Sequence, residues 1–288
     1  MATYENCYEI LDHLRYGINE HSSGFMAGTD TTCPHSNSYL VKKINVAQRQ
    51  IYNILLRRIK GEFLETASLT GVSSVYTLPA DFGILVHFKD DNGLKVHQIP
   101  PSRKHTTNAT GFKRLYYRKG QTLVLDKDGI TATYTLEYYR KPRELDQGAT
   151  SAGAATSATL ATTAKGIVDY YNGMKIENIT DSTVDEISDY TAARVATVTN
   201  IWAASKTYGI VSDIPEPFHH LIGPKAVHLT KAESPVIQEK PTASEVSEWN
   251  SQLIDALRAY AGTDLDEDPA SLFEDFGPHF PASGIVNV

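Results

Sequence analysis

The chain has 288 residues, of which 41% are hydrophobic and 21% charged, as is usual for a globular protein of one or two domains. Its net charge is −7, no run approaches the roughly 18 apolar residues of a membrane span, and its first residues lack the pattern of a signal peptide. Two cysteines, Cys7 and Cys33, cannot by themselves build a disulfide framework or a zinc site. We therefore expect a soluble protein made in a reducing compartment, with no membrane partner.

The charges are unevenly distributed along the chain. Residues 263–288 contain six acidic residues and no Lys or Arg, whereas residues 99–143 carry ten Lys or Arg against three Asp or Glu. This pattern indicates contact between parts of the chain or between subunits more than a surface for polyanions, and solvated faces are the alternative. The six acidic residues are Asp264, Asp266, Glu267, Asp268, Glu274 and Asp275.

Two helices are predicted in the first sixty residues. Apolar residues recur at spacings of three and four over residues 4–18 and again over residues 42–60, where Gly61 ends the pattern. Residues 20–40 between them are small and polar. A loop of this length in a compact domain is usually a binding loop or a flexible segment.

The next part of the chain is predicted to form an antiparallel sheet. Residues 131–138 alternate strictly, with Ala132, Tyr134, Leu136 and Tyr138 on one face. Shorter runs separated by turn residues cover 75–78, 84–89, 93–99, 112–118 and 121–126.

A change of composition follows the sheet. Apart from Leu160 and Lys165, residues 148–166 are all Ala, Thr, Ser or Gly. Side chains this small bury too little area to offset the entropy of ordering the chain, so a linker or an adaptable loop is expected. Residues 167–212 are typical of a small β module whose core contains Trp202 and several tyrosines. We interpret 148–212 as an inserted β module with its linker.

Helices return near the C-terminal end. Pro217 suits a first helical turn, and Thr242 with Glu245 forms a capping box that opens the clearest helix of the chain. One face of that helix carries the residues predicted to anchor it in the core, Trp249, Leu253 and Leu257.

No catalytic site, metal site or cofactor is predicted. The sequence lacks the GxGxxG, GxxxxGK[ST], HExxH and GxSxG motifs. Asp264, Asp266 and Asp268 begin like a calcium loop, but Pro269 stands where the sharp turn needs Gly. The adjacent histidines at 219–220 point in different directions on a helix and are best read as surface residues. The chain is therefore not expected to be an enzyme.

Several short motifs point to a known family. Residues 76–82 read YTLPADF after a helix, and residues 136–142 read LEYYRKP, followed after the insertion by IPEPFH at 214–219. These stretches resemble the head-to-tail adaptor (connector) proteins of tailed bacteriophages. The insertion is similar to a β module recurrent in phage neck and tail proteins, through residues 187–190 and 193–202.

The order of the elements and the resemblance together predict an α+β fold. N-terminal and C-terminal helices form a helical bundle beside an antiparallel β-sheet region, with an inserted small β module and an extended C-terminal arm. We expect an adaptor core over residues 1–147 and 213–262, the inserted module over 148–212, and an acidic, aromatic-containing arm over 263–288.

The resemblance also implies a function. Such adaptors are structural proteins of the virion neck, made in the cytoplasm of the bacterial host. They form dodecameric rings under the portal, extend the DNA channel and present a platform for the next component. The implied partners are the portal protein, other copies of the chain and a downstream neck or tail protein, while DNA passes through without specific binding.

The composition of residues 263–288 supports an arm that docks on a partner. A solvating tail should contain few aromatic residues, but this segment combines apolar anchors with Gly and Pro spacers, as an extended peptide in a groove does. We predict that the apolar residues bind the portal and that the acidic residues set the register. The predicted docking residues are Leu272, Phe273, Phe276, Phe280, Asp264, Asp266, Glu267 and Asp268.

Other interpretations stay open. The acidic stretch has an alternative partner in a basic patch of a neighbouring subunit, formed by Arg140, Lys141 and Arg143. The chain as a whole has an alternative role as another neck protein or a fibre-attachment protein. A less favoured alternative is a carbohydrate-binding or enzymatic module built on the tyrosines and Trp202 of the β insertion.

Overall fold

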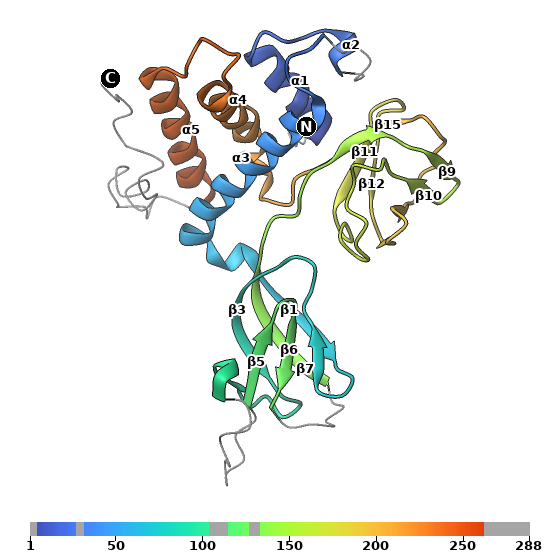
Figure 1. Ribbon diagram of the computed structural model, residues 1–288, viewed down its shortest axis with the longest axis vertical. Coiled ribbons are helices and arrows are strands. Elements are labelled where there is room, and N and C mark those ends of the chain that lie inside the picture. Colours follow the sequence, from blue (N-terminus) through green and yellow to red (C-terminus); the bar gives the residue numbers. More distant parts are fainter. Residues whose placement is uncertain (1–4, 27–31, 104–114, 127–132, 262–288) are drawn as a thin grey trace. The chain divides into compact units, whose positions relative to one another are not determined.

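The computed structural model describes residues 5–26, 32–103, 115–126 and 133–261 (Figure 1). These residues form helices and several mainly antiparallel sheets, so the predicted α+β class is confirmed. The chain divides into two compact units, one made of residues 1–59 and 142–288 and the other of residues 60–141. The first unit holds the α-helices and the small β module, and the second holds two further sheets. The predicted domain boundaries at 148 and 212 stay a prediction.

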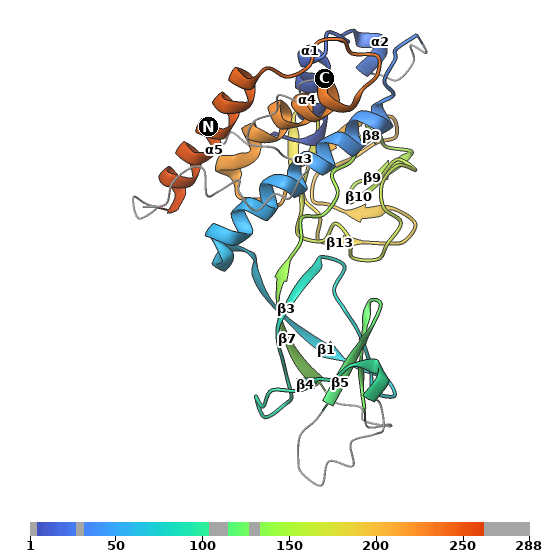
Figure 2. The same ribbon diagram turned by 60° about the vertical axis from the view of Figure 1, so that its left-hand side comes forward.

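The helical part of the first unit is built around three helices that pack on one another, α1 (Cys7–Gly17), α3 (Asn37–Arg58) and α4 (Ile222–Glu233) (Figures 1 and 2). Each buries apolar residues at spacings of three and four, such as Leu11 and Leu14 on α1. Burial of one large apolar side chain stabilises the fold by about 1.5–3 kcal/mol. The two predicted N-terminal helices are confirmed, although α3 begins before residue 42 because the Ser36 hydroxyl caps it at the Tyr39 amide.

Three further helical segments complete this part, α2 (Ser23–Met26), η3 (Glu216–Leu221) and α5 (Ala243–Ala261). Helix α5 begins at the predicted capping box, in which the Glu245 amide donates to Thr242 Oγ1 at 3.2 Å. Trp249 is only 3% exposed, and Leu253 and Leu257 are fully buried. The Trp249 indole donates to the carbonyl of Leu221 at 3.0 Å, so η3 and α5 are joined by a buried hydrogen bond as well as by packing.

The β module of the first unit consists of two four-stranded sheets. One sheet has the order β12-β11-β15-β8, with bounds β8 (Gln147–Ala149), β11 (Lys175–Asn178), β12 (Thr183–Glu186) and β15 (Thr207–Ile210). The other has the order β13-β14-β10-β9, with bounds β9 (Ala152–Ala154), β10 (Ser157–Thr159), β13 (Asp189–Tyr190) and β14 (Val195–Thr197). Buried aromatic side chains fill the module, among them Tyr171, Tyr190, Trp202 and Tyr208.

The expectation that residues 148–166 form a linker is wrong, because strands β8, β9 and β10 lie within or overlap this range. Small side chains are required here by close packing. A Cβ atom at Gly153 would lie 2.7 Å from the backbone carbonyl of Trp202, and Ala158 is fully buried. The apolar area that offsets the ordering entropy comes from the aromatic residues elsewhere in the module.

The second unit begins with η1 (Lys60–Phe63), contains η2 (Pro101–Arg103) and is built from two sheets. The first sheet has the order β1-β7-β3, with bounds β1 (Leu64–Thr70), β3 (Phe82–Lys89) and β7 (Thr133–Arg140). The second has the order β2-β6-β5-β4, with bounds β2 (Val75–Thr77), β4 (His97–Gln98), β5 (Leu115–Lys119) and β6 (Thr122–Leu125). The predicted alternation of the last strand is confirmed by the burial of Tyr134, Leu136 and Tyr138, and Ala132 lies outside the described residues.

The YTLPADF motif at residues 76–82 is part of the core of this second unit. Tyr76, Leu78 and Phe82 are all buried in one hydrophobic cluster with the apolar residues of β7. Asp81 accepts a hydrogen bond from the Tyr138 hydroxyl at 2.9 Å, which joins the end of the motif to the same strand. The motif is therefore a packing signature of this unit.

Among the described residues, no helix is both long enough and apolar enough to cross a membrane.

We predict that Trp249→Ala will lower the free energy of unfolding by about 3–5 kcal/mol, because it leaves a cavity under α5 and removes the indole hydrogen bond to the Leu221 carbonyl. Urea unfolding followed by circular dichroism would measure the change. Val246→Ala is the matched control on the same helix, since Val246 is 37% exposed, and it should cost less than about 1 kcal/mol. An equal effect of the two substitutions would contradict the assignment of Trp249 to the core.

Candidate functional site

The predicted docking residues of the C-terminal arm, Leu272, Phe273, Phe276, Phe280, Asp264, Asp266, Glu267 and Asp268, lie outside the described residues. Their role stays a prediction. The described chain ends at the last residue of α5, Ala261, so the arm follows directly from the helix that Trp249 anchors.

The predicted basic patch is largely engaged within the chain itself. Arg143 is close to Asp213, with Nε to Oδ2 at 3.0 Å, and its Nη1 donates to the carbonyl of Asn172. Arg140, in the second unit, lies 3.4 Å from Glu65, and its guanidinium carbon lies over the ring of Phe63, 5.8 Å from the centroid. These contacts give both arginines structural roles. Reversing their charges would therefore disturb folding, and would not test pairing between subunits cleanly.

Trp202 and the tyrosines of the β module are also engaged internally. Trp202 is 1% exposed, and its indole nitrogen donates to Asp185 Oδ2 at 2.8 Å. The other oxygen of Asp185 accepts from the Thr199 hydroxyl at 2.6 Å and the Asn200 amide at 3.0 Å. A ring that is buried in this way has no face on which a sugar can stack, so this feature does not support a carbohydrate-binding module.

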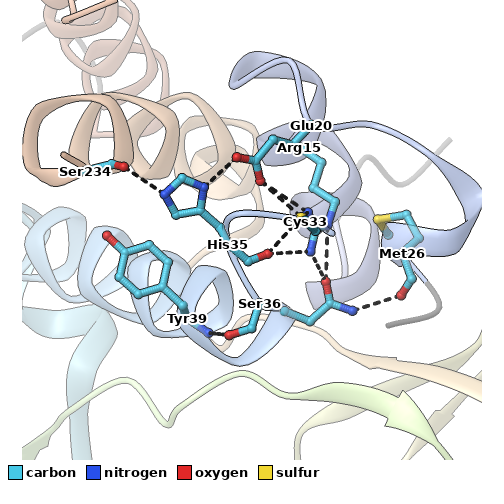
Figure 3. A network of polar contacts seen from close by, with 9 residues as sticks. Arg15, Glu20, Met26, Cys33, His35, Ser36, Tyr39 and Ser234 are labelled. Carbon is cyan, nitrogen blue, oxygen red and sulfur yellow. Dashed lines mark hydrogen bonds and ion pairs between the residues drawn. The ribbon is translucent and has the colours of Figure 1, made fainter. Parts of the chain in front are cut away.

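A buried network of polar side chains joins the helices of the first unit (Figure 3). Its centre is Arg15 of α1, which is 1% exposed. The guanidinium donates to Cys33 Sγ at 3.0 Å, to the His35 carbonyl at 3.1 Å and to Asn37 Oδ1 at 3.1 Å from Nε. Glu20 lies 3.6 Å away and supplies the opposite charge. One cation therefore holds the end of α1 against the start of α3.

His35 extends this network to α4. Its Nδ1 lies 2.6 Å from Glu20 Oε1, and its Nε2 lies 2.8 Å from the Ser234 hydroxyl at the end of α4. The Ser234 oxygen also accepts from the amide of Val236 at 3.2 Å. A neutral ring that carries its proton on Nδ1 satisfies all of these groups, since it donates to the carboxylate and accepts from the hydroxyl.

The contacts among Ser234, His35 and Glu20 have the connectivity of a hydrolytic triad. A nucleophile must meet its substrate, however, and Ser234 is fully buried while His35 and Glu20 are nearly so. The arrangement therefore acts as a structural link between α4 and the segment before α3. Catalysis gains no support from it.

The same cluster contains Cys, His and Glu, which are residue types that bind zinc. The Arg15 guanidinium lies against both the Cys33 sulfur and the Glu20 carboxylate, so the position that a metal ion would need is occupied by a side-chain cation. Within the described part of the chain, no group of three or more His, Cys, Asp or Glu is arranged to hold a metal ion.

A second buried charge lies between α1 and the β module. Burial raises the pKa of Asp146 to about 6, although hydrogen bonds from Tyr208 and Thr163 act in the opposite direction. Burial, and next the charge of Asp146, raise the pKa of Cys7 on α1. Burial also raises the pKa of Glu5 to about 6, with a smaller contribution from Glu9. We therefore expect the stability of this region to depend on pH.

A comparison with known protein families identifies the family to which the chain belongs. The family model described as SU10 adaptor protein matches residues 9–170. This range is more than half of the chain, so the chain belongs to the SU10 adaptor protein family, which is of the phage head-tail adaptor type. The resemblance inferred from the sequence is thus confirmed. A comparison with curated proteins finds no match.

Membership of this family assigns the chain to the structural proteins of a phage particle that contact other head or tail proteins. The matched range begins inside α1, contains all of the second unit and ends in the β module after β10. The Arg15 network and the YTLPADF motif both lie within it, apart from Ser234. Sequence reasoning did not find the network, because its only signal was an arginine next to the apolar stripe of α1.

Arg15→Leu is predicted to destabilise the protein by about 3–5 kcal/mol, because it leaves the buried Glu20 without its cation. Differential scanning calorimetry would measure the loss as a lowered melting temperature. Arg258→Leu is the matched control, since Arg258 is exposed on α5. A melting temperature lowered equally in both variants would contradict the role of the network.

We predict that Asp146 causes the free energy of unfolding to fall as the pH rises. Its folded-state pKa of about 6 exceeds the ordinary value of 3.8, so the folded state binds the proton more tightly than the unfolded state does. Protonated Asp146 therefore adds at most roughly 2–3 kcal/mol to the free energy of unfolding. This stabilisation is present below about pH 4 and is lost between pH 4 and 6.

Asp146→Asn should therefore flatten the decline in the free energy of unfolding between pH 4 and 7, measured by urea titration at each pH. Asp255→Asn on the exposed face of α5 is the control for loss of a carboxylate. An unaltered decline in the Asp146 variant would show that another group is responsible, and Glu5 is the next candidate.

Proposed function

We propose that this chain forms a closed ring at the head-tail junction of the virion, docks beneath the portal, extends the DNA channel and carries the next neck or tail component. The observation that carries the proposal is the match of the SU10 adaptor family to residues 9–170. The ring is proposed to contain twelve copies, as the resemblance to connector proteins implies. Identical subunits that surround a channel require closed cyclic symmetry.

The docking element is proposed to be the arm over residues 263–288, with Phe273, Phe276 and Phe280 as anchors. Large aromatic side chains supply most of the binding energy at protein interfaces, and an extended segment presents them to a groove at little steric cost. The acidic residues at 264–268 then act on association rate and salt dependence more than on affinity. The internal contacts of Arg140 and Arg143 favour this arrangement over pairing with the basic patch of a neighbour.

Native mass spectrometry of the full chain, alone and mixed with the portal ring of the same phage, tests the proposal. We expect a species that contains the portal ring and a full set of adaptor subunits. The variant Phe273→Ala/Phe276→Ala/Phe280→Ala should lose at least tenfold in occupancy of the portal. Val72→Ala/Leu94→Ala is the matched control, because both side chains are exposed apolar residues of the second unit.

A chain that does not bind the portal but binds a tail or fibre component would contradict the proposal and favour the alternative neck or fibre-attachment role. Binding to the portal that is unchanged in the triple variant would retain the adaptor role but remove the arm from it.

A further inference from the structure

Helix α3 carries a one-sided distribution of charge. Its 22 residues, Asn37–Arg58, include five Lys or Arg and no Asp or Glu. The exposed positions Lys42, Arg49, Asn53 and Arg57 are spaced by seven, four and four residues, which places them on one face of the helix. At 1.5 Å per residue this basic face of α3 is roughly 22 Å long.

The described residues neutralise the middle of this face, around Arg49, only in part. Lys43, which lies beside the face, is held by Glu233 and is largely buried. Arg49 remains 59% exposed, and its carboxylate neighbour Glu144 is 3.9 Å away. Glu144 lies closer to Lys165, at 2.8 Å, so it is shared between two cations. The part of the basic face around Arg49 therefore has the capacity for further negative charge.

A segment of the same chain carries that charge. Residues 264–275 contain six Asp or Glu and no Lys or Arg, and they begin three residues after the end of α5 at Ala261. Both views show the C-terminal ends of α5 and α3 on the same side of the helical part, at its lower left (Figures 1 and 2). Twelve extended residues span up to roughly 40 Å, which exceeds the length of the basic face.

We propose that, in the free protein, the acidic segment 264–275 binds along the basic face of α3 of its own chain. This inference goes beyond the proposed function, since it gives the start of the arm a binding site before any partner is present. Each exposed ion pair is weak, but a short tether gives the segment an effective concentration on the order of millimolar, so several weak pairs suffice. DNA is the less favoured occupant, because a chain with a net charge of −7 repels polyanions in solution.

Distance measurement between two nitroxide labels on the full chain tests the proposal. The labels are placed at Asn53→Cys, in the middle of the basic face, and at Ser271→Cys, between the two acidic clusters. Labelled protein without the added cysteines controls for reaction at Cys33. We expect a short, narrow distance distribution at low salt. In 1 M NaCl, where the screening length is about 3 Å, the distribution should broaden and shift to longer distances.

The doubly labelled variant Asp264→Asn/Asp266→Asn/Glu267→Gln/Asp268→Asn should show the broad distribution already at low salt. The doubly labelled variant Glu248→Gln/Asp255→Asn, which removes exposed charges from α5, is the matched control and should retain the narrow one. Lys42→Gln/Arg49→Gln, which removes charge from the basic face, should also give the broad distance distribution at low salt. Lys95→Gln/Lys119→Gln, which removes charge from the second unit, should retain the narrow one.

Three results would overturn the proposal. The first is a broad distribution at all salt concentrations, or a narrow one that neither salt nor neutralisation changes. The second is a short distance that disappears when labelled protein is diluted with unlabelled protein, because the segment then binds another copy. The third is binding of a fluorescent 20-base-pair duplex that is lost in Lys42→Gln/Arg49→Gln, which would assign the face to DNA. None of these measurements involves the portal, so their failure is independent of the proposed function.

Discussion

The helical part of the protein depends on the buried cation Arg15. Its guanidinium makes hydrogen bonds to Cys33, the His35 carbonyl and Asn37, and it faces Glu20. A buried charge is tolerated only when nearly all of its donors are satisfied, so these contacts fix the end of α1 relative to the start of α3. His35 then transmits the same constraint to the end of α4 through Ser234.

The other charged side chains of the protein fall into two groups, those that pair within their own unit and those that stay exposed to solvent. Arg143 and Lys43 pair with acidic residues of the same unit and are largely buried. Lys42, Arg49 and Arg57 on α3 stay exposed, and that helix contains no Asp or Glu. An adaptor that must assemble with several partners benefits from this division, since internal pairs stabilise the subunit and exposed charges remain for salt-sensitive contacts.

Much of the fold was predictable from local patterns. The capping box at Thr242 and the alternation around Leu136 follow from short-range rules of helix capping and strand pleating, and both are observed. Strand β1 was missed, because its residues are mostly exposed and polar and it is defined by pairing with β7 along its whole length. The linker prediction failed for a related reason, since the small residue Gly153 is explained only by the Trp202 backbone that approaches it.

The sequence by itself determined the fold class, the family and the contrast between an acidic C-terminal segment and basic stretches earlier in the chain. These features depend on periodicity, motifs and composition, which are local properties. Only the tertiary structure decided which charged side chains are paired within the protein. Arg15 meets Glu20 and His35, and Arg143 meets Asp213 seventy residues later, because distant segments pack together. The physical reason is that a charge becomes structural when burial removes its water, and burial is a property of the whole fold.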